Sequence, residues 1–187
     1  LVSLWIVLNG NGFLRYNPGD NSFKQCFNDK KDTTSLTSDH IVSVFEDKNG
    51  VIWLSDYTGG INRLDRAGET FRHYLRGTPC YGMYENSGGS FFVGTSSGLY
   101  TYDQKGDQFT AFLDPDTEIG QLSFNHIVED PEKNLWINNS SALIRVNPTT
   151  KETFIYSTKF SIPPYSVHPL AFSKDHKGQF HLGNGNG

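Results

Sequence analysis

The sequence has 187 residues and a formal net charge of −4, with 36% hydrophobic and 14% aromatic residues. This length fits one domain or two small ones, and the hydrophobic content is sufficient for a folded core, which excludes a disordered chain. The acidic balance excludes the large basic surface on which nucleic-acid binding depends. No apolar run reaches the ~20 residues of a membrane span, and residues 1–8 lack the charged leader and cleavage site of a signal peptide.

Residues that favour strands predominate in the composition. The chain holds 14 Phe, 9 Tyr and 19 Gly but a single methionine, Met83, and few alanines. It is therefore short of good helix formers and well supplied with residues that fit a pleated surface. The composition predicts an all-β fold.

One pattern recurs along the whole chain, beginning at residues 5–17 and best preserved at 40–65, with further copies at 89–103, 126–147 and 175–183. Each copy has a bulky residue on an apolar run, then a turn, then a second apolar run. We call the bulky position the slot. The slot residues are Trp5, Trp53, Phe92, Trp136 and His181, and the glycines that open the second run are Gly12, Gly60 and Gly98. The copies lie about 40–50 residues apart, a period typical of propeller repeats.

Four short strands are predicted within each copy. In the best copy they cover 41–45, 51–54, 61–64 and 71–74, and the turns between them hold residues that accept the positive φ angles of tight hairpins. Four antiparallel strands per repeat are typical of a β-propeller blade. Because one blade cannot bury both of its faces, the slot residue is expected in the layer between blades, and Gly60 lets the third strand begin close to its neighbour. A β-sandwich is the weaker alternative.

We therefore predict an all-β, partial β-propeller of about four blades, each a four-stranded antiparallel sheet, as a single fragment over residues 1–187. The repeat units cover about 1–35 (partial), 36–78, 79–119, 120–165 and 166–187 (partial). Units cut in mid-blade indicate a piece of a larger propeller, whose remaining blades would be its partners. Unpaired strands at the cut edges favour self-association.

The best copy also supports a family resemblance. Its sequence, from His40-Ile41-Val42 through Val51-Ile52-Trp53-Leu54 to Gly59-Gly60-Ile61-Asn62-Arg63-Leu64-Asp65, resembles the two-component regulator propeller repeat. The resemblance implies a periplasmic sensor region of a hybrid two-component histidine kinase, as in Bacteroidetes. It also implies oligosaccharide binding, with the kinase outside this chain. Phe92 and His181 depart from the tryptophan of the pattern, and Ala142 departs from its glycine.

No motif indicates catalysis. A calcium loop at Asp47 is excluded, since the residues after Gly50 are Val51, Ile52 and Trp53, which cannot ligate a cation, so this segment is a hairpin turn. A sialidase-type site needs arginines that converge on one carboxylate, and a tyrosine nucleophile. Instead, one arginine recurs at the same strand position in three units, which indicates a role repeated in each blade; these are Arg15, Arg63 and Arg145.

The remaining candidates for chemistry are few. His40 and His126 open the innermost strands of their units, where the repeat consensus explains them without metal or acid–base chemistry. The chain has no nucleophile elbow, P-loop or metalloprotease motif. We expect no catalytic residue, no metal and no cofactor, and we expect Cys26 and Cys80 to be free thiols.

Propeller ligands usually sit against loops that follow the second strand and loops that join adjacent blades. The candidate ligand-binding residues there are Asp56, Tyr57, Asn138 and Asn139, in loops that extend to 58 and 141, with residues 95–97 and the connector 160–167 as further segments. Aromatic rings stack on sugar faces, and amides bond to hydroxyls. The sequence predicts a non-catalytic carbohydrate sensor. A glycan-active propeller enzyme and a protein-interaction scaffold stay as alternatives.

Overall fold

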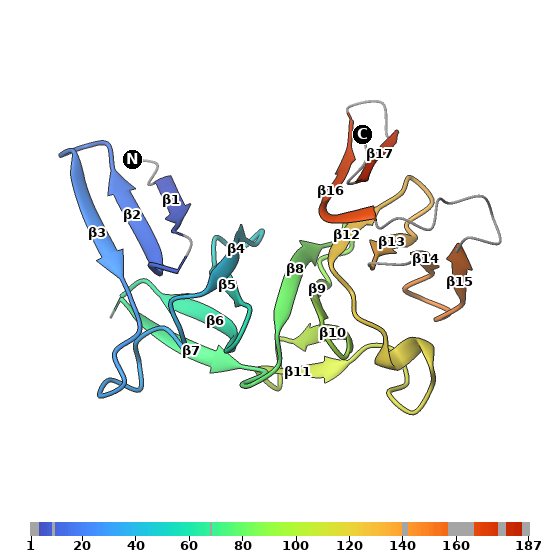
Figure 1. Ribbon diagram of the computed structural model, residues 1–187, viewed down its shortest axis with the longest axis horizontal. Coiled ribbons are helices and arrows are strands. Elements are labelled where there is room, and N and C mark those ends of the chain that lie inside the picture. Colours follow the sequence, from blue (N-terminus) through green and yellow to red (C-terminus); the bar gives the residue numbers. More distant parts are fainter. Residues whose placement is uncertain are drawn as a thin grey trace. The chain divides into compact units, whose positions relative to one another are not determined.

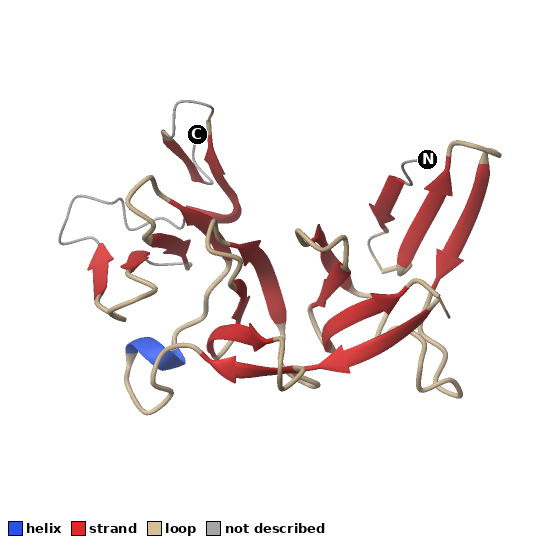
Figure 2. Cartoon of the chain, turned by 180° about the vertical axis from the view of Figure 1, so that it is seen from behind, coloured by secondary structure: helices blue, strands red, loops and turns tan. Residues whose placement is uncertain are grey.

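The computed structural model describes residues 4–8, 10–67, 69–139, 142–156, 167–175 and 179–184. Within these ranges the chain is built from short strands, and the helical turn η1 (Ile119–Gln121) is the one exception (Figure 2). The all-β prediction is confirmed. The chain divides into two compact halves, Leu1–Tyr81 and Gly82–Gly187, which are described separately.

The first half contains two antiparallel sheets, in which strands that follow one another in sequence are neighbours (Figure 1). The first sheet has the order β1 (Leu4–Val7), β2 (Phe13–Asn17), β3 (Ser22–Cys26). The second has the order β4 (Ile41–Glu46), β5 (Ile52–Asp56), β6 (Gly60–Asp65), β7 (Thr70–Tyr74). The four strands predicted for the best repeat copy are all present, with ends within two residues of those predicted.

The second half repeats this arrangement. One sheet holds β8 (Cys80–Glu85), β9 (Phe91–Thr95), β10 (Gly98–Asp103) and β11 (Gln108–Ala111). The next holds β12 (His126–Glu129), β13 (Leu135–Asn138), β14 (Leu143–Val146) and β15 (Thr153–Tyr156). The strands β16 (Val167–Lys174) and β17 (Phe180–Asn184) form a two-stranded sheet.

Each half buries its core between adjacent sheets. In the first half Phe13 from one sheet packs in the same cluster as Ile52 and Leu54 from the other, and Trp5 packs against this cluster. In the second half the equivalent cluster joins Phe92 and Leu99 to side chains of β12–β14. Trp53 is 1% exposed. Trp5 and Phe92 therefore pack between adjacent sheets, as a propeller blade requires, and Trp53 is buried as well.

A carboxylate in the preceding turn fixes the indole ring of two slot tryptophans, Trp53 and Trp136. Asp47 accepts hydrogen bonds from the Val51 backbone N–H at 2.9 Å and from Trp53 Nε1 at 2.9 Å. In the same way, Asp130 accepts a hydrogen bond from Trp136 Nε1 at 2.7 Å. The Asp of the hairpin is therefore a structural partner of the slot, which is why the turn is acidic without being a cation site.

In the third repeat, both the turn aspartate and the slot tryptophan are replaced by other residues. Asn86 accepts the backbone N–H of Ser90 at 2.8 Å, as an aspartate does in the other turns, and the slot residue is Phe92, which has no N–H to donate. In the last repeat His181 Nε2 lies 3.5 Å from Asp175 Oδ2. An acid thus accompanies a slot residue with a ring N–H, and an amide accompanies phenylalanine.

Gly60 shows why glycine opens the third strand. Its φ is +103°, and a Cβ atom there would lie 2.3 Å from the carbonyl oxygen of Tyr74 on β7. Only glycine tolerates both the dihedral angle and the contact. The predicted close approach at this position is confirmed.

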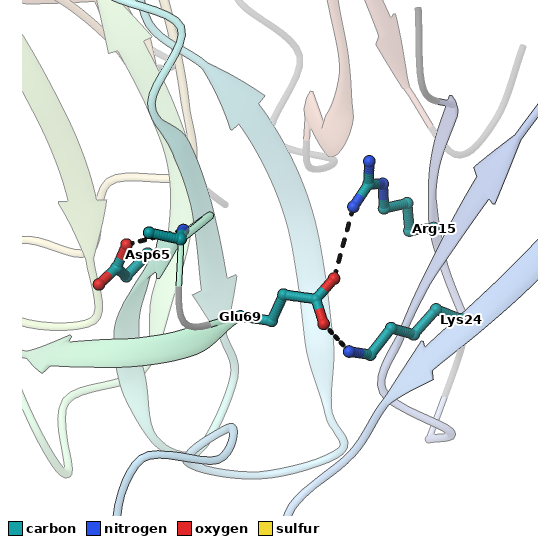
Figure 3. Close-up of polar contacts among 5 residues, drawn as sticks. Arg15, Lys24, Asp65 and Glu69 are labelled. Atoms are coloured by element: carbon teal, nitrogen blue, oxygen red, sulfur yellow. Dashed lines mark hydrogen bonds and ion pairs between the residues drawn. The ribbon is translucent and has the colours of Figure 1, made fainter.

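The recurring arginines lie opposite the slot. Arg15, Arg63 and Arg145 are the cross-strand partners of the three slot tryptophans. In the first half Glu69 adds an ion pair to Arg15 at 3.5 Å and a second to Lys24 on β3, so one carboxylate links the two sheets (Figure 3). Arg15 and Lys24 are themselves cross-strand neighbours. Like charges directly opposite each other are unfavourable, and the acid from the next sheet compensates them.

Candidate functional site

Two of the four candidate residues, Asp56 and Tyr57, lie at one edge of the β4–β7 sheet. Three segments meet there: the β3–β4 connector (residues 27–40), the β5–β6 turn (57–59) and the β7–β8 turn (75–79). All three belong to the first half of the chain. They correspond to the loops that were expected to carry a ligand.

The connector is held in one shape by its own side chains. Asn28 Nδ2 donates to the carbonyl oxygen of Leu36 at 2.6 Å, and the Ser35 hydroxyl donates to the carbonyl oxygen of Asp32 at 2.8 Å. The Phe71 backbone N–H donates to the carbonyl oxygen of Thr34 at 2.7 Å, which attaches the connector to β7. Its side chains therefore occupy fixed positions before any ligand arrives.

Asp56 lies at the centre of this edge, but the fold uses its carboxylate. It is fully buried and accepts hydrogen bonds from the hydroxyls of Thr37 and Ser38, both at 2.9 Å, and from the backbone N–H groups of Thr58 and Gly59 at 2.7 and 2.8 Å. This carboxylate closes the β5–β6 turn and fastens the connector to it. Ligand binding by Asp56 stays a prediction, and the structure gives it a structural role.

The two candidate asparagines have comparable roles in the second half. Asn138 Oδ1 accepts the backbone N–H of His126 at 2.8 Å, and Asn139 Oδ1 accepts that of Ala142 at 2.7 Å. Both side chains are buried. Thr95 closes the corresponding β9–β10 turn by accepting the backbone N–H of Ser97 at 3.1 Å. A contact between these asparagines and a ligand stays a prediction. Residues 140–141 and 160–166 of the predicted loops lie outside the described residues.

Tyr57 is the candidate whose side chain is accessible. It is 56% exposed, and its ring centroid lies 5.8 Å from that of Tyr81, with the ring planes tilted by 55°. The Tyr81 carbonyl oxygen accepts the Ser55 hydroxyl at 2.9 Å, which places the second ring relative to β5. Burial raises the pKa of the Tyr81 phenol, and the neighbouring Tyr57 adds to this, so the Tyr81 ring is a neutral aromatic surface at physiological pH. Nothing in the sequence marks Tyr81, which is one of several tyrosines on strands.

A hollow of about 310 Å³ lies beside the β5–β6 turn. Its lining combines polar groups with apolar surface in similar shares and comes from all three segments of this edge. The lining residues are Asn28, Asp29, Lys30, Asp32, Thr33, Ser35, Leu36, Thr37, Gly59, His73, Arg76 and Gly77. Sequence reasoning identified none of these residues as site residues, and Gly59 directly follows the predicted loop 56–58.

His73 is fixed as a neutral ring. Its Nε2 lies 2.8 Å from the carbonyl oxygen of Ser35, and Nδ1 faces the guanidinium of Arg76. A carbonyl oxygen only accepts and a guanidinium only donates, so Nε2 carries the proton and Nδ1 accepts. Burial lowers the pKa of His73, and the charge of Arg76 lowers it further. Arg76 is thereby held at the rim of the hollow.

Metal and thiol chemistry find no support in the described part of the chain. No three His, Cys, Asp or Glu side chains within it are arranged to hold a metal ion. Cys26 and Cys80 are free thiols, and burial raises the pKa of Cys80 to about 12, so it is not a nucleophile at physiological pH. No helix in the described part of the chain has the length and the hydrophobicity needed to span a bilayer.

These sheets and turns define a set of β-propeller blades, one of which carries a preformed hollow. Residues 35–58 match the family model of the two-component regulator propeller, which confirms the resemblance found in the best repeat copy. The chain is similar to histidine kinase P4 of Formosa agariphila, with 26% identity over 164 residues. That match covers 82% of this chain and 12% of the kinase, so the chain spans about one eighth of that relative.

Solved structures share the fold. The extracellular domain of a hybrid two-component system from Bacteroides thetaiotaomicron superposes with a TM-score of 0.73 at 20% identity, covering 97% of this chain and 24% of that one. A virginiamycin B lyase from Staphylococcus aureus superposes with a TM-score of 0.71 at 14% identity, covering 97% of this chain and 59% of the lyase. The partial β-propeller fold is confirmed. The predicted boundaries of the repeat units stay predictions.

Proposed function

We propose that the chain is part of the periplasmic sensor region of a hybrid two-component histidine kinase, in which it binds a carbohydrate and catalyses no reaction. The propeller repeat at residues 35–58, the similarity to a histidine kinase and the fold shared with an extracellular two-component domain support the sensor assignment. The kinase lies outside this chain in the proposal. The fold alone does not separate a sensor from an enzyme, since a lyase has it as well.

The observation that carries carbohydrate binding is the exposed ring of Tyr57. Its 56% exposed ring pairs with that of Tyr81 and stands on the β5–β6 turn, whose Gly59 lines the hollow. An aromatic face next to a few fixed hydrogen-bonding groups is the composition of a small-molecule site. It suits a sugar, whose ring has an apolar face and a rim of hydroxyls.

Calorimetric titration of the 187-residue chain with defined neutral hexasaccharides tests this function. The probes are xylan, mannan, β-1,3-glucan, α-1,4-glucan and arabinan fragments. We expect one of them to bind. We expect Tyr57→Ala to weaken that binding at least tenfold, because stacking of a nucleic-acid base on one aromatic ring contributes on the order of 1–3 kcal/mol and a sugar face should contribute within that range. Phe23→Ala is the matched control, since Phe23 is 64% exposed and stacks on Tyr16 in the first sheet.

Three results would contradict the proposal. One is that no saccharide binds, and another is that the saccharide binds equally to the Tyr57→Ala and Phe23→Ala variants. The third is cleavage of the bound saccharide, detected by chromatography of the titrated sample, which would favour a glycan-active propeller enzyme instead.

A further inference from the structure

The hollow beside the β5–β6 turn is lined by donors and acceptors from different segments of the chain. Asp29 and Asp32 contribute carboxylates from the connector, while His73 and Arg76 contribute ring and guanidinium nitrogens from β7 and the turn after it. Lys30 adds a second cation at the rim. Two carboxylates and two cations leave the lining without a net charge. Such a lining suits a ligand that is itself uncharged and can both donate and accept hydrogen bonds.

The carboxylates are oriented by the connector backbone. Asp29 Oδ1 accepts the Lys31 backbone N–H at 2.9 Å, and Asp32 Oδ1 accepts the Thr34 backbone N–H at 2.8 Å. The hydrogen bonds to these two side chains within the described residues use Oδ1 in both cases. Hydrogen bonds to a carboxylate whose orientation is already fixed require little ordering when a ligand binds.

The part of the hollow formed by His73 and Arg76 is equally ordered. The Ser35 carbonyl oxygen and His73 together hold Arg76 as described above, and the turn that presents Arg76 places the flanking Leu75 at φ +50°. A bulky residue in this left-handed region is strained, and such strain is concentrated at ligand sites. Arg76 is therefore presented by a turn that the local sequence alone does not favour.

A buried amide lies directly behind this part of the hollow. Asn62 Oδ1 accepts the Thr37 backbone N–H at 3.0 Å, and Asn62 is the cross-strand partner of His73, so the two neighbours of the amide both line the hollow. Because the Thr37 N–H can only donate, the atom facing it is the oxygen, and Nδ2 points elsewhere. Within the described residues Asn62 Nδ2 makes no hydrogen bond although it is buried. Buried donors without a partner are rare, so this amide next to two lining residues is an unusual feature of the edge.

We infer that this hollow holds one uncharged sugar residue of the ligand through its hydroxyls. Hydroxyls donate to Asp29 and Asp32 and accept from Arg76. The inference rests on the proposed function and adds the site, the contacts and the class of sugar. At about 310 Å³ the hollow is at the lower end of the ~300–1,000 Å³ of small-molecule pockets, which fits a single ring. The next ring of an oligosaccharide would then reach Tyr57.

Titration of two wall variants, with matched controls, tests the inference. The variants are Arg76→Met, which keeps the aliphatic stem, and Asp32→Asn, which keeps Oδ1 for the Thr34 N–H. The controls are Arg66→Met, which removes an exposed arginine paired with Glu46 at 2.8 Å, and Asp65→Asn, whose Oδ1 accepts the Ala67 N–H at 3.0 Å. The probes are the neutral hexasaccharides named above and hexagalacturonate.

We expect a neutral hexasaccharide to bind best, with each wall variant weakening it about tenfold or more and each control changing it less than twofold, since a hydrogen bond to a charged group changes affinity by that order. Far-UV circular dichroism verifies that each variant folds. If Tyr57→Ala abolishes binding but both wall variants bind normally, the site in the hollow is refuted while the proposed function stands. Tighter binding of hexagalacturonate refutes the uncharged class. If no saccharide binds, the proposed function and this inference fail together.

Discussion

Exchanging Asp47 for asparagine tests the hydrogen bond that ties the β4–β5 turn to the slot residue. In the native chain Asp47 Oδ1 accepts the backbone N–H groups of Asn49 and Val51, each at 2.9 Å, and Oδ2 accepts Trp53 Nε1 at 2.9 Å. Asparagine has a single oxygen. If that oxygen stays on the backbone donors, its NH₂ group faces the indole N–H, and two donors oppose each other.

The size of the effect follows from the burial of Trp53, which is 1% exposed. A hydrogen bond to a charged group contributes about 1.5–3 kcal/mol, and a buried donor left without an acceptor costs about 1–3 kcal/mol. We expect Asp47→Asn to lower the free energy of unfolding by about 2–3 kcal/mol. The double variant Asp47→Asn/Trp53→Phe reproduces the Asn86–Phe92 pair of the third repeat, in which no ring N–H needs an acceptor. Its loss should be smaller than the sum of the two single losses by about 1–2 kcal/mol.

Urea unfolding followed by far-UV circular dichroism measures all four members of this cycle, since the indole fluorescence changes with Trp53. If the losses at 47 and 53 add within about 0.5 kcal/mol, the two residues act independently and the proposed link between turn and slot is refuted.

Two further outcomes follow from the backbone and from the histidines. Gly60→Ala should lower the free energy of unfolding by roughly 2–4 kcal/mol, because the new methyl group would lie 2.3 Å from the Tyr74 carbonyl oxygen. The control Gly77→Ala, also at positive φ but with nothing within 4 Å, should lower it by only about 1 kcal/mol. Equal losses of the two variants in calorimetry would contradict this. Burial lowers the pKa of His73 and His126 below the 6.5 of the unfolded chain, so the unfolded state takes up protons first as the pH falls. Stability is therefore complete above pH 6.5 and decreases as the pH falls through the folded-state pKa values, and urea midpoints between pH 7.5 and 5 should show this, with a smaller decrease in His73→Gln. A midpoint independent of pH over this range would show that neither ring is held neutral.

The sequence predicted the architecture because the repeat provides the same information several times. Trp53 and Gly60 each have counterparts in other copies, so a chance match at one position carries little weight. The positions also obey simple physical requirements: a large ring that is buried, and a residue without Cβ where two strands meet. Irregular loop lengths did not disturb the prediction, since they change the period and not the order of the strands.

The candidate site was predicted less well, and Asp56 shows why. A polar residue after a strand is equally compatible with a ligand contact and with closing the turn, and only burial separates the two. One signal was present, however. Asp56, Thr95 and Asn139 each lie three residues after a slot residue, and all three close the following turn. The argument that assigns the recurring arginines to the fold applies equally to these residues.

Recurrence thus distinguishes the groups that build a blade from those that are particular to one blade. His73 occupies a register position whose counterparts in the other sheets are Gln25, Ala111 and Ile155, so no structural requirement of the repeat selects histidine there. The hollow combines such non-recurring residues from segments more than 40 positions apart, between Asn28 and Gly77. No local pattern joins them in the sequence, and only the folded blade brings them to one edge. A group that the repeat does not require, held in place by strained or buried neighbours, is where a function specific to this chain is expected.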